Sequence, residues 1–263
     1  RALRFSANYN LPIEPNSWMA IIRGVRRILD YVSVTDIMDE WRKVEAENHW
    51  RYLELLFESQ ILHGLIPEVA ALSRIKIPKH GQEGQIESVL ERIVNKMHAY
   101  PEEKTYDWYG TMACMFSGVG MLYTAEFFDD EWTFHRSPEI GAKVTRKILN
   151  RLRFLPQDTD LICHLVLYNR RFLYMLTDKG IRRFKALDEY ERLIAMARAE
   201  IKATDGNYAA FNHNMRMMER ADMPEEMLEP LLNGREIMDF TSLKPGPAVG
   251  IIREALLQAQ VAG

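Results

Sequence analysis

Hydrophobic residues recur every three or four positions along most of the chain, and strictly alternating stretches are scarce. This period matches the 3.6 residues per turn of an α-helix, so the pattern predicts helix almost throughout. The expected helices are 1–10, 48–62, 86–98, 105–127, 139–153, 158–176, 186–204, 207–220, 225–232 and 248–260. We therefore predict an all-α fold, an elongated array of helical subdomains without a significant sheet.

Capping residues and glycine predict where several of these helices begin and end. Asn16 or Ser17 is expected to cap one early helix, and Ser33 or Thr35 the next. Gly64 is expected to end the strongly amphipathic helix that precedes it.

Two breaks divide the chain, and only the first contains both Gly and Pro. The first, 76–85, is expected to be a loop, and the second surrounds Pro224. They predict three parts, residues 1–75, 76–222 and 223–263.

The charge is unevenly distributed. The whole chain carries a formal charge of −3, which does not indicate a nucleic-acid partner, and its 47% hydrophobic content is typical of a folded globular protein. Residues 143–185, however, contain eleven Lys or Arg against three Asp, a net charge of +8. This segment suggests a face for an anionic partner, while an ordinary solvated set of helix faces is the alternative.

Composition excludes several protein classes. The two cysteines form no CxxC motif and lie among apolar neighbours, so reduced core thiols in the cytoplasm are expected rather than a disulfide scaffold. No apolar run approaches the roughly 18 residues of a membrane span, and no secretory leader is expected. The opening, in mid-helix pattern and without Met, indicates a piece of a longer protein or a processed product.

Three groups of segments resemble motifs of one protein family, and they occur in the same order as in that family. They are residues 1–7 (RALRFSA) with 13–14 (IE); 39–41 (DEW) through 55–56 (LL) to 64–68 (GLIPE); and 232–237 (LNGREI) with 243–247 (LKPGP), Gly250 and Gln260. Together they resemble the C-terminal neck, body and tail of the class II tRNA nucleotidyltransferase (CCA-adding enzyme) and bacterial poly(A) polymerase family. The resemblance makes residues 1–75 the neck and RNA-binding helices, 76–222 the body and 223–263 the tail.

The resemblance implies a function for the longer protein. Members of this family add nucleotides from ATP or CTP to an RNA 3′ end without a template, and carboxylates of a head domain hold the Mg²⁺. The glycine-rich and paired-Asp motifs of that head do not occur here. The chain is therefore expected to dock tRNA and complete the nucleotide pocket, without catalysing by itself. Whether the product is CCA, CC, A or a poly(A) tail stays open.

Two arginines are expected at the nucleotide. Arg1 and Arg4 match family arginines at the bound nucleotide, and they share one helix face. A guanidinium suits this role because its planar fork pairs with phosphate and its charge is constant. Ordinary surface ion pairs are the alternative.

The body resembles an HD-type metal domain whose ligands are lost. Ser117 and Gly118 stand where the family has a His-Asp pair, and Ser137 and Asn169 stand where it has histidines. These side chains cannot hold a divalent metal tightly, so no metal site and no metal-dependent phosphohydrolase activity are expected.

RNA is a polyanion, so its binding surface is expected to be basic and to read backbone shape more than sequence. The predicted RNA-binding residues are Arg23, Arg26, Arg27, Lys143, Arg146, Lys147, Arg151, Arg170, Arg171, Arg182, Arg183 and Lys185.

Two rival interpretations remain open. One is a stand-alone helical RNA-binding or scaffold protein without enzymatic activity. The other is a hydrolase with a rebuilt metal site, which stoichiometric Mn, Fe or Zn would indicate.

Overall fold

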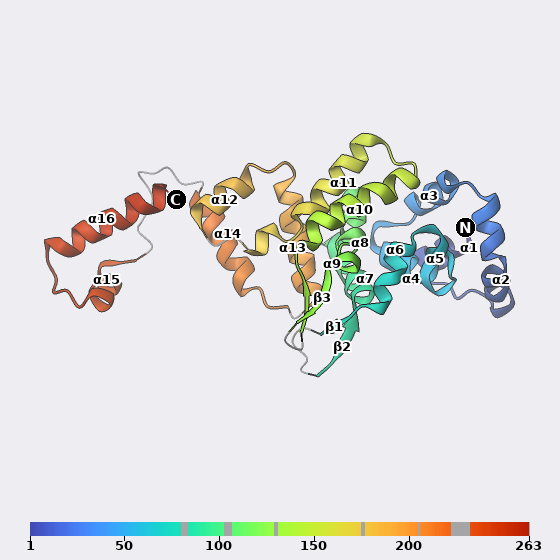
Figure 1. Cartoon of the computed structure of the whole chain (residues 1–263), viewed down its shortest axis with the longest axis horizontal. Helices are drawn as coiled ribbons and strands as arrows, with labels where there is room; N and C mark the ends of the chain where they lie inside the picture. Colours follow the sequence, from blue (N-terminus) through green and yellow to red (C-terminus); the bar gives the residue numbers. More distant parts are fainter. Residues whose placement is uncertain are drawn as a thin grey trace. The chain divides into compact units, whose positions relative to one another are not determined.

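A computed structural model shows the chain to be mainly helical (Figure 1). The structure describes residues 1–79, 84–102, 107–128, 131–174, 177–204, 206–221 and 232–262. The predicted all-α class is confirmed, since the strands in these ranges form only two short two-stranded hairpins. Nearly all of the predicted helix 225–232, and the break at Pro224, lie outside the described residues.

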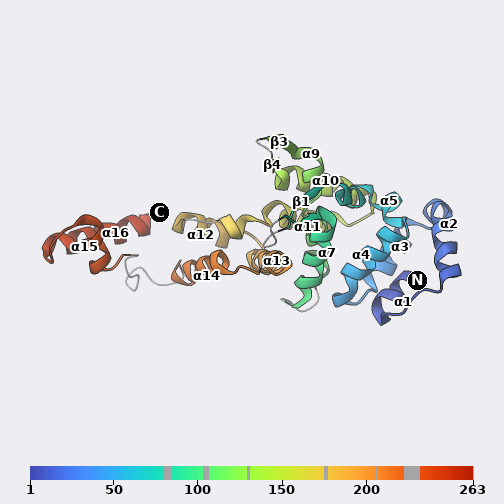
Figure 2. The ribbon, with the colours of Figure 1, turned by 90° about the horizontal axis from the view of Figure 1, so that it is seen from below.

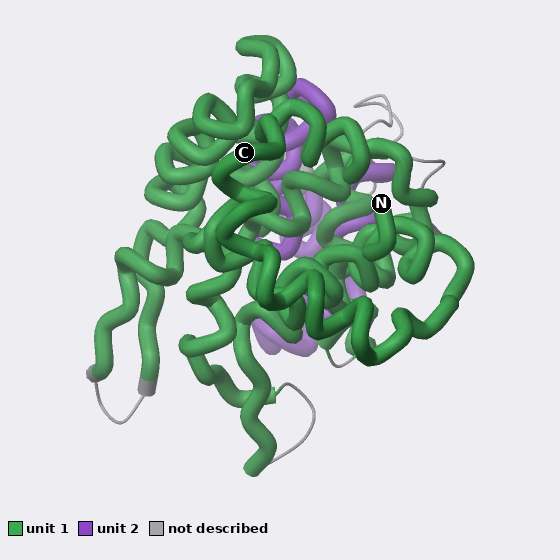
Figure 3. Tube along the Cα trace, turned by 90° about the vertical axis from the view of Figure 1, so that its right-hand side faces the viewer, with its two compact units in different colours: residues 1–170, 191–207 green, residues 171–190, 208–263 purple. Residues whose placement is uncertain are grey.

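The chain divides into two compact units (Figure 3). Unit 1 comprises residues 1–170 and 191–207, and unit 2 comprises residues 171–190 and 208–263. The division into neck, body and tail stays a prediction. Within the described ranges, no helix combines the length and apolar character needed to cross a bilayer.

Unit 1 contains most of the secondary structure. Its elements are α1 (Ala2–Tyr9), α2 (Pro15–Tyr31), α3 (Val34–Arg42), η1 (Ala46–Asn48), α4 (His49–Glu58), α5 (Ile61–Leu65), α6 (Pro67–Ala71), η2 (Leu72–Arg74), β1 (Lys76–Pro78), β2 (Ile86–Ser88), α7 (Val89–Ala99), η3 (Tyr100–Glu102), α8 (Trp108–Phe116), α9 (Met121–Thr124), β3 (Ala125–Phe128), β4 (Glu131–Phe134), α10 (Ser137–Arg151), α11 (Pro156–Tyr168) and all but the first residue of α13 (Tyr190–Ala203).

Helix α8 lies at the centre of the unit 1 core. Every residue from Gly110 to Phe116 is buried, which requires neighbours on all sides of the helix. Helices α7 and α11 pack against it, and α10 packs in turn along α11 (Figure 1). At the other end of the unit, α4 contacts both α7 and α1. This packing holds α1, α7 and α10 within one unit, to which nearly all of α13 also belongs.

Local capping explains the helix starts. Ser33 caps α3 as predicted, by accepting a hydrogen bond from the Asp36 amide. The prediction that Asn16 or Ser17 caps α2 was wrong: the carboxylate of Glu14 accepts both of their amide hydrogens instead. Pro15 is the first residue of the helix and has no N–H. The amides of Asn16 and Ser17 are therefore the first that the side chain of Glu14 can accept from.

The predicted helix 105–127 is broken in the structure. Helix α8 ends at Phe116 and the short helix α9 follows. Strands β3 and β4 then pair as an antiparallel hairpin, with Phe127 opposite Trp132. Figure 2 shows this hairpin beside α9 and α10. The aromatic residues Phe127 and Phe128 favour a strand, but β3 has only four residues and follows a long apolar stretch.

Two other predicted helices end early, and one predicted loop is ordered differently. The helix 48–62 stops at Glu58 because Gln60 adopts a left-handed conformation (φ 67°), and α5 begins after it. The helix 158–176 stops at Tyr168, where the Asn169 amide hydrogen-bonds to the Val166 carbonyl and competes with the helical pattern. The prediction of a loop over 76–85 was wrong for residues 76–78, which form β1 and pair with β2.

Unit 2 has its own aromatic core. Its elements are η4 (Arg171–Tyr174), α12 (Asp178–Lys185), α14 (Ala209–Ala221), α15 (Gly234–Thr241) and α16 (Pro247–Ala262). Phe172 lies 5.5 Å from Phe184 and 5.0 Å from Phe211, measured between ring centroids. Asn214 on α14 also donates a hydrogen bond to the Phe172 carbonyl. Helices α15 and α16 pack against each other, as Figures 1 and 2 show.

Candidate nucleotide- and RNA-binding sites

The carboxylate of Glu40 on α3 gathers both predicted nucleotide-binding arginines. Its Oε2 accepts a hydrogen bond from Arg4 Nε at 3.0 Å, and its Oε1 accepts one from Lys43 Nζ at 3.0 Å. Arg1 Nε lies 3.6 Å from Oε1. Hydrogen bonds from Lys43 and Arg4 outweigh desolvation and lower the pKa of Glu40 to about 2. We call these four residues the Glu40 cluster; its carboxylate stays ionised at neutral pH.

The two arginines differ in their freedom to meet a ligand. The Arg1 side chain is 80% exposed, whereas the Arg4 side chain is 17% exposed. The Arg4 guanidinium also lies 4.5 Å from the centroid of the Phe5 ring. Arg1 can therefore reach a ligand at little cost, while Arg4 is held in place by its neighbours. Contact of either residue with a nucleotide stays a prediction.

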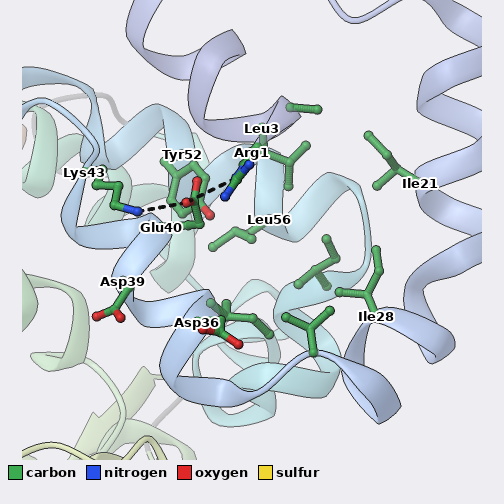
Figure 4. Close-up of a pocket in the computed structure, with 14 residues that line it drawn as sticks. Arg1, Leu3, Ile21, Ile28, Asp36, Asp39, Glu40, Lys43, Tyr52 and Leu56 are labelled. Atoms are coloured by element: carbon green, nitrogen blue, oxygen red, sulfur yellow. Dashed lines mark hydrogen bonds and ion pairs between the residues drawn. The ribbon is translucent and has the colours of Figure 1, made fainter.

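A cavity of about 500 Å³ adjoins the Glu40 cluster (Figure 4). One part of its lining is charged and the other is apolar. Its labelled lining residues are Arg1, Leu3, Ile21, Ile28, Asp36, Asp39, Glu40, Lys43, Tyr52 and Leu56. Small-molecule sites commonly measure about 300–1,000 Å³ and combine apolar walls with a few converging polar groups. The cavity can therefore bind a small organic ligand.

Helix α2 supplies one apolar wall of this cavity. None of its residues is buried, although one face of the helix is rich in Ile, Leu and Val. The helix meets α5 closely at Gly64, where an added Cβ would lie 2.1 Å from Leu29 Cδ1. Ile21 and Ile28 line the cavity rather than a closed core. Asp36, Asp39 and Tyr52 were not predicted as site residues, since sequence periodicity reports burial and not cavity lining.

The predicted RNA-binding arginines of α2 are all exposed. Arg23 and Arg27 line an open surface hollow together with Asn16 and Met19. Arg26 lies 3.9 Å from Asp30 of the same helix, and both are highly exposed. Such a pair is weak, so the three arginines can bind an anion from solvent at little cost.

The four predicted basic residues of α10 are exposed but fall into two kinds. Arg146 Nη1 lies 2.6 Å from Asp160 Oδ1. Arg151 makes two hydrogen bonds to the carboxylate of Glu68 on α6. Among the described residues, Lys143 and Lys147 make no ion pair. These two lysines are thus the more available cations of the helix.

The remaining predicted cations are divided between the units. Arg170 is half-buried at the end of the continuous part of unit 1, and Arg171 is exposed in unit 2. On α12 the buried residues Ile181 and Phe184 fix the helix, which leaves its basic residues outside the core. Those residues are Arg182, Arg183 and Lys185.

The four residues predicted to replace metal ligands line one cavity of about 40 Å³. Ser117 and Gly118 follow α8, Ser137 begins α10, and Asn169 follows α11. Segments far apart in the sequence therefore converge as the predicted site requires. An added Cβ at Gly118 would lie 2.8 Å from Val89 Cγ1, so a larger residue at this position requires Val89 to move.

A buried ion pair, which we did not predict, borders the same cavity. Lys96 of α7 is 1% exposed, and its Nζ lies 2.7 Å from Glu200 Oε2 on α13. The sequence does contain a signal for it: Lys96 follows Val89 and Ile93 on the apolar face of α7, where a charged residue needs a buried partner. Across the described ranges, His, Cys, Asp and Glu form no group of three able to hold a metal ion.

Comparisons with known proteins bear on the family. No protein-family model matches the chain. It is 28% identical over 217 residues to a CC-adding tRNA nucleotidyltransferase of Thermus thermophilus, which covers 80% of this chain and 49% of the relative. It is 29% identical over 146 residues to an A-adding tRNA nucleotidyltransferase of Deinococcus radiodurans, with 50% and 32% covered. The chain has moderately distant homologues among tRNA nucleotidyltransferases.

These homologues confirm the resemblance in part. The chain spans about half the length of the CC-adding relative and about a third of the A-adding one. The degenerate HD-type domain and the C-terminal tail motif stay predictions, as do the individual nucleotide and RNA contacts.

Proposed function

We propose that this chain is the RNA-binding C-terminal part of a template-independent RNA 3′-end nucleotidyltransferase. The similarity to the CC-adding enzyme over 80% of the chain carries this proposal. In it, the helices bind tRNA while a separate head domain performs the transfer. ATP or CTP and the catalytic Mg²⁺ belong to that head, and the chain by itself incorporates no nucleotide.

The exposed cations of α2 and α10 are the proposed RNA contacts in unit 1. Lys143 and Lys147 are available because no carboxylate pairs with them in the described part of the chain. Binding a phosphate there displaces counterions and breaks no internal contact. Arg146 is already paired with Asp160, and Arg151 with Glu68 on α6. A phosphate would have to share these guanidinium groups, so the two arginines contribute less to RNA binding. The unit 2 cations on α12 extend the same function.

The cavity beside the Glu40 cluster is the proposed wall of the nucleotide pocket. Arg1 lines this cavity and is exposed enough to meet a phosphate, whereas Arg4 positions the carboxylate of Glu40. The apolar side chains of α1 and α2 can pack against a base or ribose, while the charged rim orients polar groups. The role as a soluble cytoplasmic tRNA-processing protein follows from the same proposal.

Charge reversal tests the RNA-binding role. The double variant Lys143→Glu/Lys147→Glu is expected to weaken tRNA binding at least tenfold at moderate salt, equally for different tRNAs, because phosphate contacts carry no sequence information. The matched control is Lys76→Glu/Lys79→Glu near β1, which changes the net charge equally at another place. Filter binding or fluorescence anisotropy measures both.

Two results would count against this assignment. Equal losses in the two double variants would show only a general charge effect. Unchanged affinity in Lys143→Glu/Lys147→Glu would remove α10 from the RNA surface. Incorporation of labelled ATP or CTP into tRNA by the chain alone would contradict the assignment of catalysis to a head domain.

A further inference from the structure

The cavity where the family resemblance places metal ligands is lined by positive charge. Besides Ser117, Gly118, Ser137 and Asn169, its lining includes the side chains of Arg92, Lys96 and Arg170 and one carboxylate, that of Glu200. We call it the Lys96 cavity. A divalent cation entering it would meet three fixed positive charges and one negative charge. The residues present therefore do not fit a metal ion, and they favour the opposite sign of ligand.

The lowered pKa of Glu200 indicates that the positive charges around it are strong. Burial alone raises the pKa of a carboxyl group, yet the charges of Lys96, Arg170 and Arg92 and the hydrogen bond from Lys96 lower the pKa of Glu200 below its usual value. The carboxylate thus stays ionised and neutralises only one of the three cations. Glu87 pairs with Arg92 at 2.7 Å, which leaves one positive charge in excess.

Hydrogen-bond donors remain available around the cavity. Lys96 has three N–H groups and lies within bonding distance of one carboxylate. Arg92 uses its Nε and Nη2 on Glu87 and the Pro78 carbonyl, which leaves other N–H groups of its fork. Within the described chain Arg170 makes no ion pair or hydrogen bond of its own. Ser137, buried at the start of α10, adds a hydroxyl to the lining.

The geometry points to a binding site for one small oxyanion in the Lys96 cavity, of the class of inorganic phosphate or the terminal phosphate of a nucleotide. The volume of about 40 Å³ exceeds the roughly 10–15 Å³ that a single water requires, and it is too small for a base or a sugar. The anion is held by Arg170 and by the remaining donors of Lys96 and Arg92. The oxyanion would thus lie where the family resemblance places metal ligands.

Thermal unfolding and ³¹P NMR of the 263-residue chain, without RNA, test this site. At constant ionic strength, inorganic phosphate is expected to raise the unfolding midpoint saturably relative to chloride, with one site per chain in the NMR titration. The variant Arg170→Gln is expected to weaken binding at least tenfold, whereas Arg170→Lys retains most of it. The control Arg23→Gln removes an exposed guanidinium of the same unit and is expected to leave phosphate affinity unchanged.

Defined outcomes separate the alternatives. Saturable binding of a nucleoside monophosphate as well as of phosphate assigns the site to a terminal phosphate, and binding of phosphate alone assigns it to the free anion. Equal unfolding midpoints in phosphate and chloride, or unchanged phosphate affinity in a folded Arg170→Gln variant, overturn the proposal. Stoichiometric Mn²⁺ binding that excludes phosphate also overturns it. None of these results depends on whether the chain binds tRNA.

Discussion

The guanidinium of Arg151 on α10 holds the carboxylate of Glu68 on α6 with two parallel hydrogen bonds, Nη1–Oε1 at 2.8 Å and Nη2–Oε2 at 2.7 Å. The pair joins residues 83 positions apart in sequence. Arg151 was predicted to bind RNA, and Glu68 belongs to the Gly64–Glu68 motif of the family resemblance. The contact therefore places one predicted RNA-binding residue in a structural role as well.

Charge reversal at neighbouring positions of α10 should separate these two roles. Arg151→Glu is expected to lower the free energy of unfolding by about 1 kcal/mol, because it replaces a bidentate pair by repulsion between two carboxylates, and the pair is partly exposed. Lys147→Glu is expected to leave stability nearly unchanged, since no partner is lost in the described part of the chain. Urea denaturation measures both, and equal stability losses would contradict the assignment.

The stabilisation contributed by Glu40 is expected to be lost in acid. The folded-state pKa of Glu40 is about 2, below the 4.5 of an ordinary glutamate, so its contribution is complete above about pH 5. As the pH falls from 5 towards 2, the unfolded state takes up the proton first, and this contribution is lost. Glu40→Gln is expected to cost about 1–3 kcal/mol at pH 7 and little at pH 2–3.

A pH series of unfolding measurements checks this. The matched control is Glu47→Gln in η1, an exposed glutamate without a hydrogen bond or ion pair in the described chain, which should leave the pH dependence intact. A stability difference between the native chain and Glu40→Gln that stays constant from pH 2.5 to 7 would contradict the assigned shift.

Substitution of two glycines by alanine is expected to change the stability of the chain in opposite directions. At Gly120 an added Cβ would lie 1.9 Å from the Ser137 carbonyl oxygen, and this backbone cannot move without displacing the start of α10. Gly120→Ala is expected to destabilise the chain by about 1–3 kcal/mol or more. At Gly24, inside α2, no heavy atom lies within 4 Å of the added Cβ, so Gly24→Ala is expected to stabilise by about 0.5–1 kcal/mol. Thermal or urea unfolding of the two variants should therefore shift in opposite directions, and a shift in the same direction would refute the packing described here.

The buried pair of Lys96 and Glu200 predicts a non-additive effect. Lys96→Met removes the ammonium group and leaves the buried Glu200 carboxylate without its ion-pair partner. This is expected to lower the free energy of unfolding by about 3–5 kcal/mol. The double variant Lys96→Met/Glu200→Leu is expected to lose less than Lys96→Met alone, because the Glu200 carboxylate is then no longer buried without its lysine partner. A double-mutant cycle in urea measures the coupling; additive losses would mean that the two side chains do not act as a pair.

The sequence predicted the helical class because the 3.6-residue period is strong over long segments such as α10 and α13. It failed where the decisive interaction is local or short. A left-handed Gln60 ends α4, and the side chain of Asn169 ends α11, yet neither residue type is a reliable helix terminator. Helices α12 and α15 were missed because each has only eight residues.

The candidate sites show a similar division. The positions of Ser117, Gly118, Ser137 and Asn169 came from the family resemblance, and in the structure all four line one cavity. The partner of Lys96 could not be predicted, since Glu200 lies more than 100 residues away and nothing in its local sequence sets it apart. The engagement of Arg151 by Glu68 was invisible for the same reason.

The salt dependence of tRNA binding by the unmodified chain tests the central claim most directly. If exposed lysines and arginines grip the phosphate backbone, the logarithm of the association constant should fall linearly with the logarithm of the salt concentration, with a slope of about −0.7 to −0.9 for each phosphate contacted. We predict a slope equivalent to several contacts for tRNA. An affinity that does not change between low and moderate salt, or no measurable binding at low salt, would contradict the account.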